Sequence, residues 1–321
     1  MLEIVLVVAA LSASCFSSTG VGSASPGIEQ PEESQLQVLL LDFSGSRAFE
    51  LLKKQVALGP RVPGSRPHQQ CRELIADTLA PFCEGITEQD FSDVVNGHHY
   101  DFHNLLAYQN PHAERLVILA AHYDTRPFAD RDSPQNYATP IPGANDGASG
   151  VAVLLELARV LHGRLPENVG LLFLFTDGED TGLATRQMFK GAEYFASNMP
   201  TELRQRIAFG VLLDMIGDAN LNIKPEKNSE AVASGIYSAL LELQDSLGLQ
   251  GFLATGQNTI CDDHLAFIER GVKMYDVIDF DYRYWHTLED TVDRCSPQSL
   301  QTVGLCVGNL ILNYAAGKFS I

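Results

Sequence analysis

Four short apolar runs, separated by stretches with helical patterns, constrain the fold of this chain more than any other feature of its sequence. The runs cover residues 116–121, 169–175, 207–213 and 272–278. Continuous apolar runs of this length are typical of strands that are buried on both faces, and strands that alternate with helices are typical of a parallel sheet. The sequence therefore predicts an α/β fold, built as a three-layer α/β/α sandwich around a mostly parallel mixed sheet.

Amphipathic helical patterns fill the segments around these predicted strands. The first begins near Phe43 and ends at the Gly59-Pro60 break, and the others are expected at residues 69–82, 147–161, 187–198, 229–247, 264–269 and 298–316. No internal repeat or low-complexity stretch interrupts the alternation. We therefore expect a single domain over residues 38–321, preceded by a polar, Pro-containing linker over residues 25–37.

The start of the chain has the pattern of an export signal. Residues 4–13 are apolar, and the following residues up to 25 are mostly small. Ten apolar residues are too few for a membrane span, which needs about 20, so we expect a signal peptide over residues 1–24 with cleavage near Ala24. The first three residues carry no basic charge, and Cys15 leaves a lipid anchor as an alternative. The protein is thus predicted to be exported: secreted, periplasmic or in the secretory pathway.

Acidic residues strongly outnumber basic ones. The 321 residues include 40 Asp and Glu against 22 Lys and Arg, which gives a formal net charge of −18. A chain with this charge and without a basic run is repelled by nucleic acids and anionic membranes, so we expect no nucleic-acid partner. After the leader no apolar segment reaches the length of about 18 residues that a membrane helix needs, so we expect no transmembrane segment in the mature chain.

The cysteine pattern excludes two common kinds of site. Six cysteines occur, and their spacing includes no Cys-x-x-Cys pair, which argues against a zinc finger or a thioredoxin-like redox motif. Cys71 and Cys83 either form a disulfide in an oxidising compartment or remain free buried thiols, and the sequence leaves both outcomes open.

Histidine and acidic residues follow three of the predicted strands, at the ends where ligands bind in open parallel sheets, and His286 stands in a loop beyond the fourth strand. Taken singly, each has an ordinary role, and Asp146 stands where an aspartate caps the start of a helix. Taken together, so many acids in one cleft are costly unless a cation neutralises them. A mixture of imidazole and carboxylate ligands favours Zn²⁺ over Mg²⁺ or Ca²⁺. The residues concerned are His122, Asp124, Asp146, Asp177, Glu179, Asp180, Asp214 and His286.

The motifs that contain these residues resemble the zinc aminopeptidase superfamily, and within it most closely the zinc-type glutaminyl-peptide cyclotransferases, or glutaminyl cyclases. The resemblance covers about residue 49 to the C-terminus and includes a cyclase-like loop over residues 59–65 (GPRVPGS). The six motifs are residues 122–125 (HYDT), 143–150 (GANDGASG), 178–180 (GED), 213–217 (LDMIG), 262–264 (DDH) and 285–287 (WHT). The resemblance implies a zinc aminopeptidase-like fold.

It also implies a role for each matching residue. In a cyclase, one zinc ion would be held by Asp146, Asp180 and His286. Glu179 would be the proton shuttle and Trp285 a wall of the substrate pocket, while Asp214 and Asp262 would form a hydrogen-bonded acid pair. In a two-metal aminopeptidase, Asp146 would bridge the ions, and His122 and Asp214 would be ligands of the second one. All of these residues are present, so the number of zinc ions, one or two, stays open.

The chain departs from the cyclase pattern in two places. The usual Glu-Glu pair is Glu179-Asp180, so the metal or the backbone must shift by about one methylene. Animal cyclases also carry a tryptophan soon after this pair, but residues 181–186 contain no aromatic side chain. Another residue must therefore complete the pocket wall, and the candidates are Phe128, Phe189 and Tyr284.

The resemblance favours a zinc-dependent glutaminyl-peptide cyclotransferase, an acyltransferase that converts the N-terminal Gln of peptides or proteins to pyroglutamate and releases ammonia. The first alternative is a zinc aminopeptidase that removes N-terminal residues. A non-catalytic binding protein on the same fold is disfavoured, because the chain contains Glu179, the acid that the resemblance implies is needed for turnover but not for zinc binding. In both enzymatic readings the partners are peptide or protein N-termini. The physiological substrate and the oligomeric state stay open.

Overall fold

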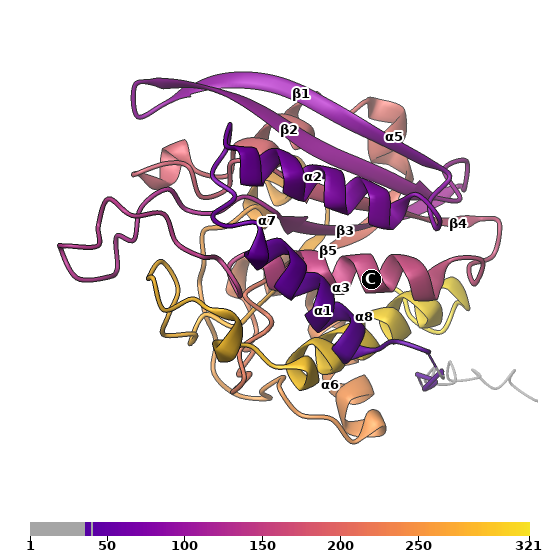
Figure 1. The fold of residues 1–321 in the computed structure, drawn as a ribbon. Helices are drawn as coiled ribbons and strands as arrows, with labels where there is room; N and C mark the ends of the chain where they lie inside the picture. Colours follow the sequence, from indigo (N-terminus) through magenta and orange to yellow (C-terminus); the bar gives the residue numbers. More distant parts are fainter. Residues whose placement is uncertain (1–35, 40) are drawn as a thin grey trace, which may run out of the picture. The chain divides into compact units, whose positions relative to one another are not determined.

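A six-stranded mixed sheet lies at the centre of the fold in this computed structural model (Figure 1). The structure describes residues 36–39 and 41–321. The strand order is β1-β2-β4-β3-β5-β6, in which β3 to β6 run parallel to one another and β1 and β2 are antiparallel to their neighbours. The strands are β1 (Gly85–Val95), β2 (His98–Gln109), β3 (Arg115–His122), β4 (Val169–Thr176), β5 (Ile207–Asp214) and β6 (Met274–Ile278). The predicted mostly parallel mixed sheet is confirmed.

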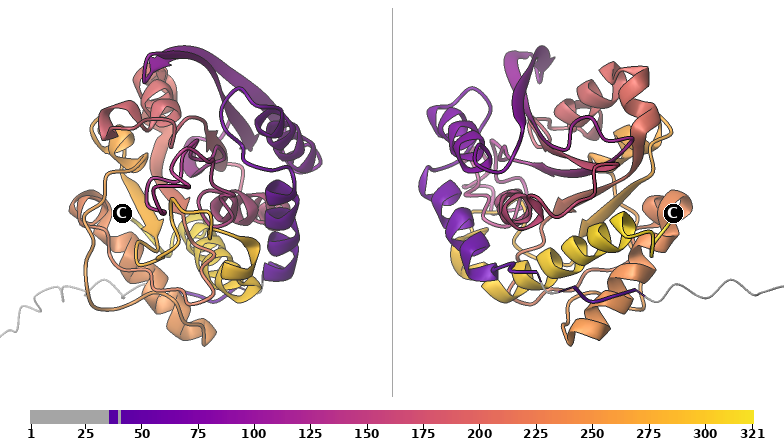
Figure 2. Two further views of the ribbon diagram at one scale, coloured as in Figure 1. Left: turned by 60° about the vertical axis from the view of Figure 1, so that its left-hand side comes forward. Right: turned by 90° about the vertical axis from the view of Figure 1, so that its right-hand side faces the viewer.

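Helices cover both faces of this sheet (Figure 2). One face carries α1, α2, α3, α6 and α8, and the other carries α4 and α7. Their bounds are α1 (Gly45–Ala57), α2 (Arg66–Leu79), α3 (Ala148–Leu161), α4 (Lys190–Asn198), α5 (Thr201–Arg206), α6 (Lys227–Leu247), α7 (His264–Ile268) and α8 (Pro297–Ala315). Short 3-10 turns lie at Thr185–Gln187 and Val292–Arg294. The three-layer arrangement is the one that the sequence predicted.

The alternation of side chains along β3 explains why the strand is apolar throughout. Val117 and Leu119 face the larger core, which also contains residues of α3 and α8, whereas Ile118 and Ala120 face the smaller core beside α4 and α7. Successive side chains of a strand point to opposite faces, so a strand covered on both faces must be apolar at every position. The predicted buried strands follow from this requirement.

The hairpin formed by β1 and β2 was not predicted. It lies at the top of Figure 1, and its turn is Asn96-Gly97, where both residues have positive φ angles of 51° and 79°. Most side chains of β1 are exposed or half-buried, because β1 is the edge strand of the sheet. An edge strand of this kind lacks the continuous apolar run by which the other strands were found.

Several smaller differences separate the sequence prediction from the structure. The helix expected over residues 187–198 begins only at Lys190, because a 3-10 turn and a left-handed Phe189 precede it. The short helix α5 was not predicted. Cys71 and Cys83 are free thiols, and Cys71 is buried in the core. Within the described residues, no helix is both long enough and apolar enough to cross a membrane.

The predicted signal peptide, residues 1–24, lies outside the described residues, as does most of the predicted linker, residues 25–37. Both stay predictions, and so does the boundary of the domain at residue 38.

The carboxyl ends of β3, β4, β5 and β6 meet at one edge of the sheet. His122 at the end of β3 is opposite Thr176 of β4, and Asp214 at the end of β5 is opposite Ile278 of β6. The start of α3 approaches the same edge closely, since a Cβ atom on Gly150 would lie 2.1 Å from the backbone oxygen of Leu213. This packing brings Asp146, just before α3, to the ends of the strands.

Candidate metal and active site

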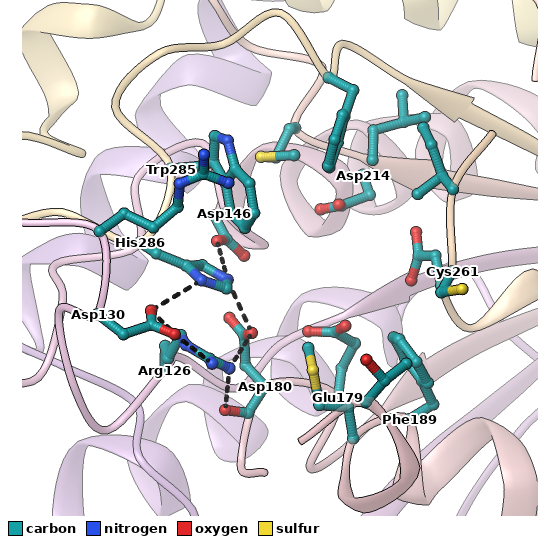
Figure 3. A pocket seen from close by; sticks show the side chains of 18 of the residues that line it. Arg126, Asp130, Asp146, Glu179, Asp180, Phe189, Asp214, Cys261, Trp285 and His286 are labelled. Carbon is teal, nitrogen blue, oxygen red and sulfur yellow. Dashed lines mark hydrogen bonds and ion pairs between the residues drawn. The ribbon is translucent and has the colours of Figure 1, made fainter. Parts of the chain in front are cut away.

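A pocket of about 380 Å³ opens at this edge of the sheet, and Figure 3 shows the side chains that line it. His122 is not among the lining residues, and only 2% of its surface is exposed. The residues predicted from the sequence that line the pocket are Asp146, Glu179, Asp180, Asp214, Asp262, Trp285 and His286. The structure therefore brings all of the predicted site residues to one place.

His122 is surrounded by carboxylates. Its Nε2 atom lies 3.2 Å from Oδ1 of Asp146 and 3.2 Å from Oδ1 of Asp214, and its Nδ1 atom lies 3.5 Å from Oδ1 of Asp124. Burial by itself would lower the pKa of His122, but these three carboxylates raise it well above its ordinary value. The strand end thus holds an imidazole within reach of several negative charges.

His286 completes the opposite side of the cluster. Its Nε2 atom lies 3.2 Å from Oδ1 of Asp180 and 3.8 Å from Oδ2 of Asp146. Burial would lower the pKa of His286, but the charge of Asp180 is the main cause that raises it to about 9. The three residues expected to hold one zinc ion, Asp146, Asp180 and His286, therefore converge.

Asp146 does not cap α3, which corrects the ordinary role considered for it. The N-cap of α3 is Gly147, and no side chain makes a capping hydrogen bond there. The Asp146 carboxylate instead faces the two histidines. Burial and the neighbouring charge of Asp180 raise the pKa of Asp146 to about 7, which shows that this crowding is costly for the protein alone.

The donor set fits a bound cation. His122, Asp146 and Asp180 offer ligand atoms that all lie within 4.8 Å of one another. One buried atom of this group, Oδ2 of Asp180, has no hydrogen-bond partner among the described residues. Buried polar atoms are normally paired, and a cation would pair these carboxylates and offset their mutual repulsion. Mixed imidazole and carboxylate donors fit Zn²⁺.

Asp124 positions the turn that carries Glu179 and Asp180. Its two carboxylate oxygens accept hydrogen bonds from the backbone N–H groups of these residues, each at 3.2 Å. Burial and the charge of Asp180 raise the pKa of Glu179 well above its ordinary value. Burial also acts on Asp180, but His286 and Arg126 outweigh it and lower the pKa of Asp180. The pKa values of two adjacent acids are thus shifted in opposite directions, a pattern typical of acid–base sites.

Asp214 and Asp262 both line the pocket, but no hydrogen bond joins them in the structure. Asp214 instead contacts Nε2 of His122 at 3.2 Å. Burial, followed by the charge of Asp214, raises the pKa of Asp262 to about 6. The two carboxyls therefore interact electrostatically, and the expected hydrogen-bonded pair stays a prediction.

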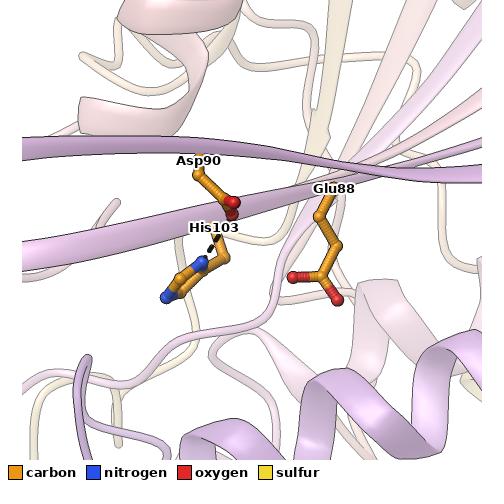
Figure 4. A group of neighbouring side chains, drawn as sticks. All are labelled: Glu88, Asp90 and His103. Carbon is orange, nitrogen blue, oxygen red and sulfur yellow. Dashed lines mark hydrogen bonds and ion pairs between the residues drawn. The ribbon is translucent and has the colours of Figure 1, made fainter.

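Two further clusters among the described residues have metal-like compositions. One is formed by Asp262, His264 and Asp276, where the His264 ring lies between carboxylate oxygens of Glu226, at 3.2 Å, and Asp276, at 3.4 Å. On the exposed hairpin, Glu88, Asp90 and His103 lie close together (Figure 4). There Asp90 already pairs with His103 at 2.7 Å. In the first of these clusters, both ring nitrogens of His264 and both carboxylate oxygens of Asp276 are buried without a hydrogen-bond partner among the described residues, but of its members only Asp262 lines the pocket.

Aromatic side chains line the pocket beside the metal candidates. Trp285 packs against Phe280, with ring centroids 5.2 Å apart, and Phe189 also lines the pocket. Phe189 is thus the one of the three wall candidates that contributes to this pocket. Phe128 packs on Arg126 instead, and Tyr284 packs between Arg283 and Arg294.

Sequence reasoning missed two residues next to the metal candidates. Arg126 donates hydrogen bonds to Asp130 and Asp180, and Asp130 contacts Nδ1 of His286 at 3.0 Å. Both follow the 122–125 motif in a loop that has no periodic pattern. The only available signal was the proximity of an Arg and an Asp to that motif.

Comparisons with known proteins agree with this geometry. Residues 104–311 match the model of peptidase family M28. The chain is 27% identical over 282 residues to a glutaminyl-peptide cyclotransferase of Drosophila melanogaster, an alignment that covers 79% of this chain and 77% of that protein.

Solved structures give the same picture. A glutaminyl cyclase of Bacteroides thetaiotaomicron is 32% identical, with a TM-score of 0.79 over 84% of this chain and 98% of that one. A zinc-dependent exopeptidase of Parabacteroides distasonis is 30% identical, with a TM-score of 0.81 over 86% of this chain and 100% of that one. The zinc aminopeptidase-like fold is confirmed, and the chain belongs to peptidase family M28.

Proposed function

We propose that the protein is a zinc-dependent glutaminyl-peptide cyclotransferase, which converts an N-terminal Gln of a peptide or protein to pyroglutamate and releases ammonia. The observation that carries the proposal is the position of Glu179. Its carboxyl is buried, has a raised pKa and lines a pocket, and the three metal-ligand candidates converge beside it. The similarity to proteins named glutaminyl-peptide cyclotransferase and glutaminyl cyclase favours this reaction over others on the same fold.

Asp146, Asp180 and His286 are the proposed ligands of one zinc ion. Their side chains converge at the pocket, and unpaired atoms such as Oδ2 of Asp180 support the assignment. A bound zinc ion with an open position supplies a Lewis acid that polarises a substrate carbonyl. Asp180 is one methylene shorter than the glutamate expected from the cyclase pattern, but a carboxylate of either length is a suitable ligand.

Glu179 is the proposed proton shuttle. The α-amine of the N-terminal Gln attacks the γ-carboxamide carbon of the same residue, so the ring C–N bond forms and the bond to the leaving nitrogen breaks. Glu179 accepts a proton from the amine and delivers one to that nitrogen, which leaves as ammonia. Burial and the charge of Asp180 raise its pKa, so this carboxyl binds a proton more readily than an exposed glutamate does and is suited to proton transfer. Nucleophile and electrophile belong to one residue, so proximity supplies much of the rate.

Trp285 is the proposed wall against which the Gln side chain lies. It lines the pocket together with Asp214 and Asp262, which are proposed to bind the substrate amine as acceptors of its N–H groups. A short pocket of this kind selects the first residue of the substrate and leaves the rest of the peptide outside. The partners are therefore peptide or protein N-termini.

A zinc aminopeptidase is the second candidate function, and one arrangement favours it. His122 lies 3.2 Å from both Asp146 and Asp214, so these residues offer the ligands of a second ion beside the first. The similarity to a zinc-dependent exopeptidase points the same way. In that enzyme Glu179 would accept a proton from the attacking water, and the first peptide bond would break.

The test is to follow two products from the same Gln-initiated peptide, with purified protein that has been loaded with Zn²⁺. We expect release of ammonia without release of free amino acids. The matched variant is Trp285→Ala, which should keep zinc and lower turnover because the pocket loses its wall. Release of free amino acids without ammonia would overturn the cyclase and favour the peptidase. Equal turnover in the variant and in the unchanged protein would refute the proposed role of Trp285 as a wall for the substrate.

Export is the proposed destination of the protein, as the leader over residues 1–24 predicts. An exported enzyme would meet its substrates, the N-termini of peptides or proteins, in the same compartment. N-terminal sequencing of the mature protein, purified from the compartment in which it accumulates, tests the cleavage near Ala24.

A further inference from the structure

Two residues of the loop after β3, Arg126 and Asp130, connect the proposed zinc ligands Asp180 and His286 (Figure 3). Neither of them belongs to the ligand set proposed above. Each of them nevertheless contacts one of those ligands directly: Arg126 contacts Asp180, and Asp130 contacts His286.

The Arg126 guanidinium is held at several points. It donates to both carboxylate oxygens of Asp130, through Nε at 2.8 Å and through the second terminal nitrogen at 2.7 Å. Its other terminal nitrogen contacts Oδ1 of Asp180 at 3.2 Å, and also the backbone oxygens of Asp180 and Gly182. Only 3% of the Arg126 surface is exposed, and the ring of Phe128 packs 4.4 Å from the guanidinium carbon. A planar, bidentate arrangement of this kind is geometrically specific.

Asp130 extends this arrangement to His286. Its Oδ1 atom lies 3.0 Å from Nδ1 of the imidazole, while Nε2 of the same ring faces Asp180 at 3.2 Å. A carboxylate can only accept a hydrogen bond, so Nδ1 must carry the proton and donate it. Nε2, which faces Asp180, is then the nitrogen that would bind a cation once its own proton is lost. Acceptors that contact the other nitrogen of a metal-bound histidine commonly fix its tautomer and its ring orientation.

We propose that Asp130 is a positioning residue, which fixes the tautomer and orientation of His286, and that Arg126 locks Asp130 and Asp180 in place. The inference rests on the zinc site of the proposed function but not on the reaction catalysed there. The two side chains together prearrange two of the three proposed ligands before the metal binds. Loss of such an acceptor typically lowers metal affinity by about 10- to 100-fold.

The same loop offers a matched control, Asp132. It accepts hydrogen bonds from the backbone N–H of Leu288 at 3.0 Å and from the side chain of Asn136 at 2.9 Å. Asp132 thus ties the same loop to the segment that follows His286, but it makes no contact with the imidazole that the structure records. A variant of Asp132 separates loosening of the loop from loss of the acceptor on His286.

The experiment compares Asp130→Ala, Asp130→Asn and Asp132→Asn with the unchanged protein. Zinc affinity is measured by competition with a chromophoric chelator, and the His286 tautomer is read from the ¹⁵N chemical shifts of the metal-free protein at a pH above 9, where the imidazole is neutral. For Asp130→Ala we expect zinc binding about 10- to 100-fold weaker and a mixture of tautomers. Asp130→Asn keeps an acceptor of nearly the same shape, so it should lose less affinity and keep the Nδ1–H tautomer. Asp132→Asn should bind zinc as the unchanged protein does.

Each contrary result has a definite meaning. Unchanged zinc affinity and tautomer in Asp130→Ala would overturn the inference, and so would an equal loss of affinity in Asp132→Asn. If Asp130→Ala does not fold, Asp130→Asn alone decides, because the inference requires it to keep the tautomer and most of the affinity. Failure of the unchanged protein to bind zinc would instead overturn the proposed function, so the two failures are distinguishable.

Discussion

At the scale of single residues, the site depends on two adjacent acids with opposite environments. Asp180 lies against His286 and Arg126, which lower its pKa despite burial, whereas burial and the charge of Asp180 raise the pKa of Glu179. A carboxyl that stays ionised is suited to hold a cation, and a carboxyl that gains a proton easily is suited to transfer one. The division of roles between Glu179 and Asp180 follows from this difference.

Glu179→Gln tests this division. The amide has nearly the size and shape of the carboxyl but cannot exchange a proton near neutral pH. We expect zinc content to stay at the level of the unchanged protein and turnover of a Gln-initiated peptide to fall by about 10² to 10⁴, the usual contribution of general acid–base catalysis. Elemental analysis and an ammonia assay measure the two quantities. Loss of zinc in this variant would mean that Glu179 is a ligand.

His286→Ala and Asp146→Ala test the ligand assignment. Each removes one of three proposed donors, so we expect loss of tightly bound zinc and of all activity in both variants. In the unchanged protein a chelator should abolish activity, and added Zn²⁺ should restore it, because the ligands are already assembled by the fold. Full zinc occupancy in both variants, measured by elemental analysis, would refute the assignment.

The sequence predicted this site to the extent that its residues follow strands or motifs. His122 and Asp214 are the last residues of β3 and β5, so the strand pattern placed them correctly. Arg126 and Asp130 could not be found in this way, because their importance depends on how an irregular loop folds back onto His286. Contacts between a loop and a distant segment leave no periodic trace in the sequence.

At the scale of elements, the close contact of α3 with β5 sets the position of Asp146. Gly150 permits this contact, since an added Cβ would lie 2.1 Å from the backbone oxygen of Leu213 and 3.0 Å from Cβ of Ala121. Backbone of a central strand cannot move aside easily. The helix would have to move instead, and Asp146 with it.

Gly150→Ala is therefore expected to destabilise the protein by about 1–3 kcal/mol, the usual cost of overpacking a well-packed core. Urea unfolding of the zinc-free protein measures the change. The matched control is Gly235→Ala in α6, where the nearest atom to an added Cβ lies 3.8 Å away. There alanine should stabilise by about 0.5–1 kcal/mol, because it has the higher helix propensity. An unchanged free energy of unfolding in Gly150→Ala would show that the close contact of α3 with β5 does not require glycine at this position.

The start of α6 gives a prediction that depends on pH. Glu226 is its N-cap and accepts a hydrogen bond from the backbone N–H of Ser229 at 2.7 Å. Burial would raise the pKa of Glu226, but hydrogen bonds from His264 and Ser229 outweigh it and lower the pKa from 4.5 to about 2. A carboxyl with a lowered pKa stabilises the folded state above pH 4.5, and this contribution is lost as the pH falls toward 2.

Glu226→Gln should therefore lower the free energy of unfolding at pH 7 by roughly 2–3 kcal/mol. The difference from the unchanged protein should shrink as the pH falls below 4.5, because the unchanged protein then loses the same contribution. Urea unfolding at several pH values measures it, with Glu242→Gln on the exposed side of α6 as the control. A difference that stays constant with pH would contradict the ionised state assigned to Glu226.

The hairpin of β1 and β2 shows where element prediction reached its limit. The central strands are buried on both faces and therefore have continuous apolar runs, whereas β1 is mostly exposed and carries polar residues. One usable signal was present. Asn96-Gly97 is a dipeptide typical of a two-residue hairpin turn, and it joins the two strands in the structure. The flanking segments, however, lack the apolar alternation of strands, and without it the dipeptide alone does not predict a hairpin.

At the scale of the whole molecule, the sequence pattern says more about the fold than about the reaction. The alternation of strands and helices fixed the α/β class, and it placed the ligand candidates at one edge of the sheet. Cyclisation and peptide hydrolysis make similar demands on this site, because both need a cation and a proton shuttle. What separates them is the position of the substrate carbonyl in the pocket, which depends on details of size and shape that no sequence pattern encodes.

One measurement tests the cyclase most directly. Two peptides that differ only in their first residue, Gln or Leu, are incubated together with the zinc-loaded protein and followed by mass spectrometry. A pocket that binds the γ-carboxamide of Gln beside Glu179 predicts that the Gln-initiated peptide loses the mass of one ammonia and that the Leu-initiated peptide stays intact, because Leu has no side-chain carbonyl to polarise. Shortening of either peptide by its first residue, without a pyroglutamyl product, would contradict the cyclase and establish an aminopeptidase.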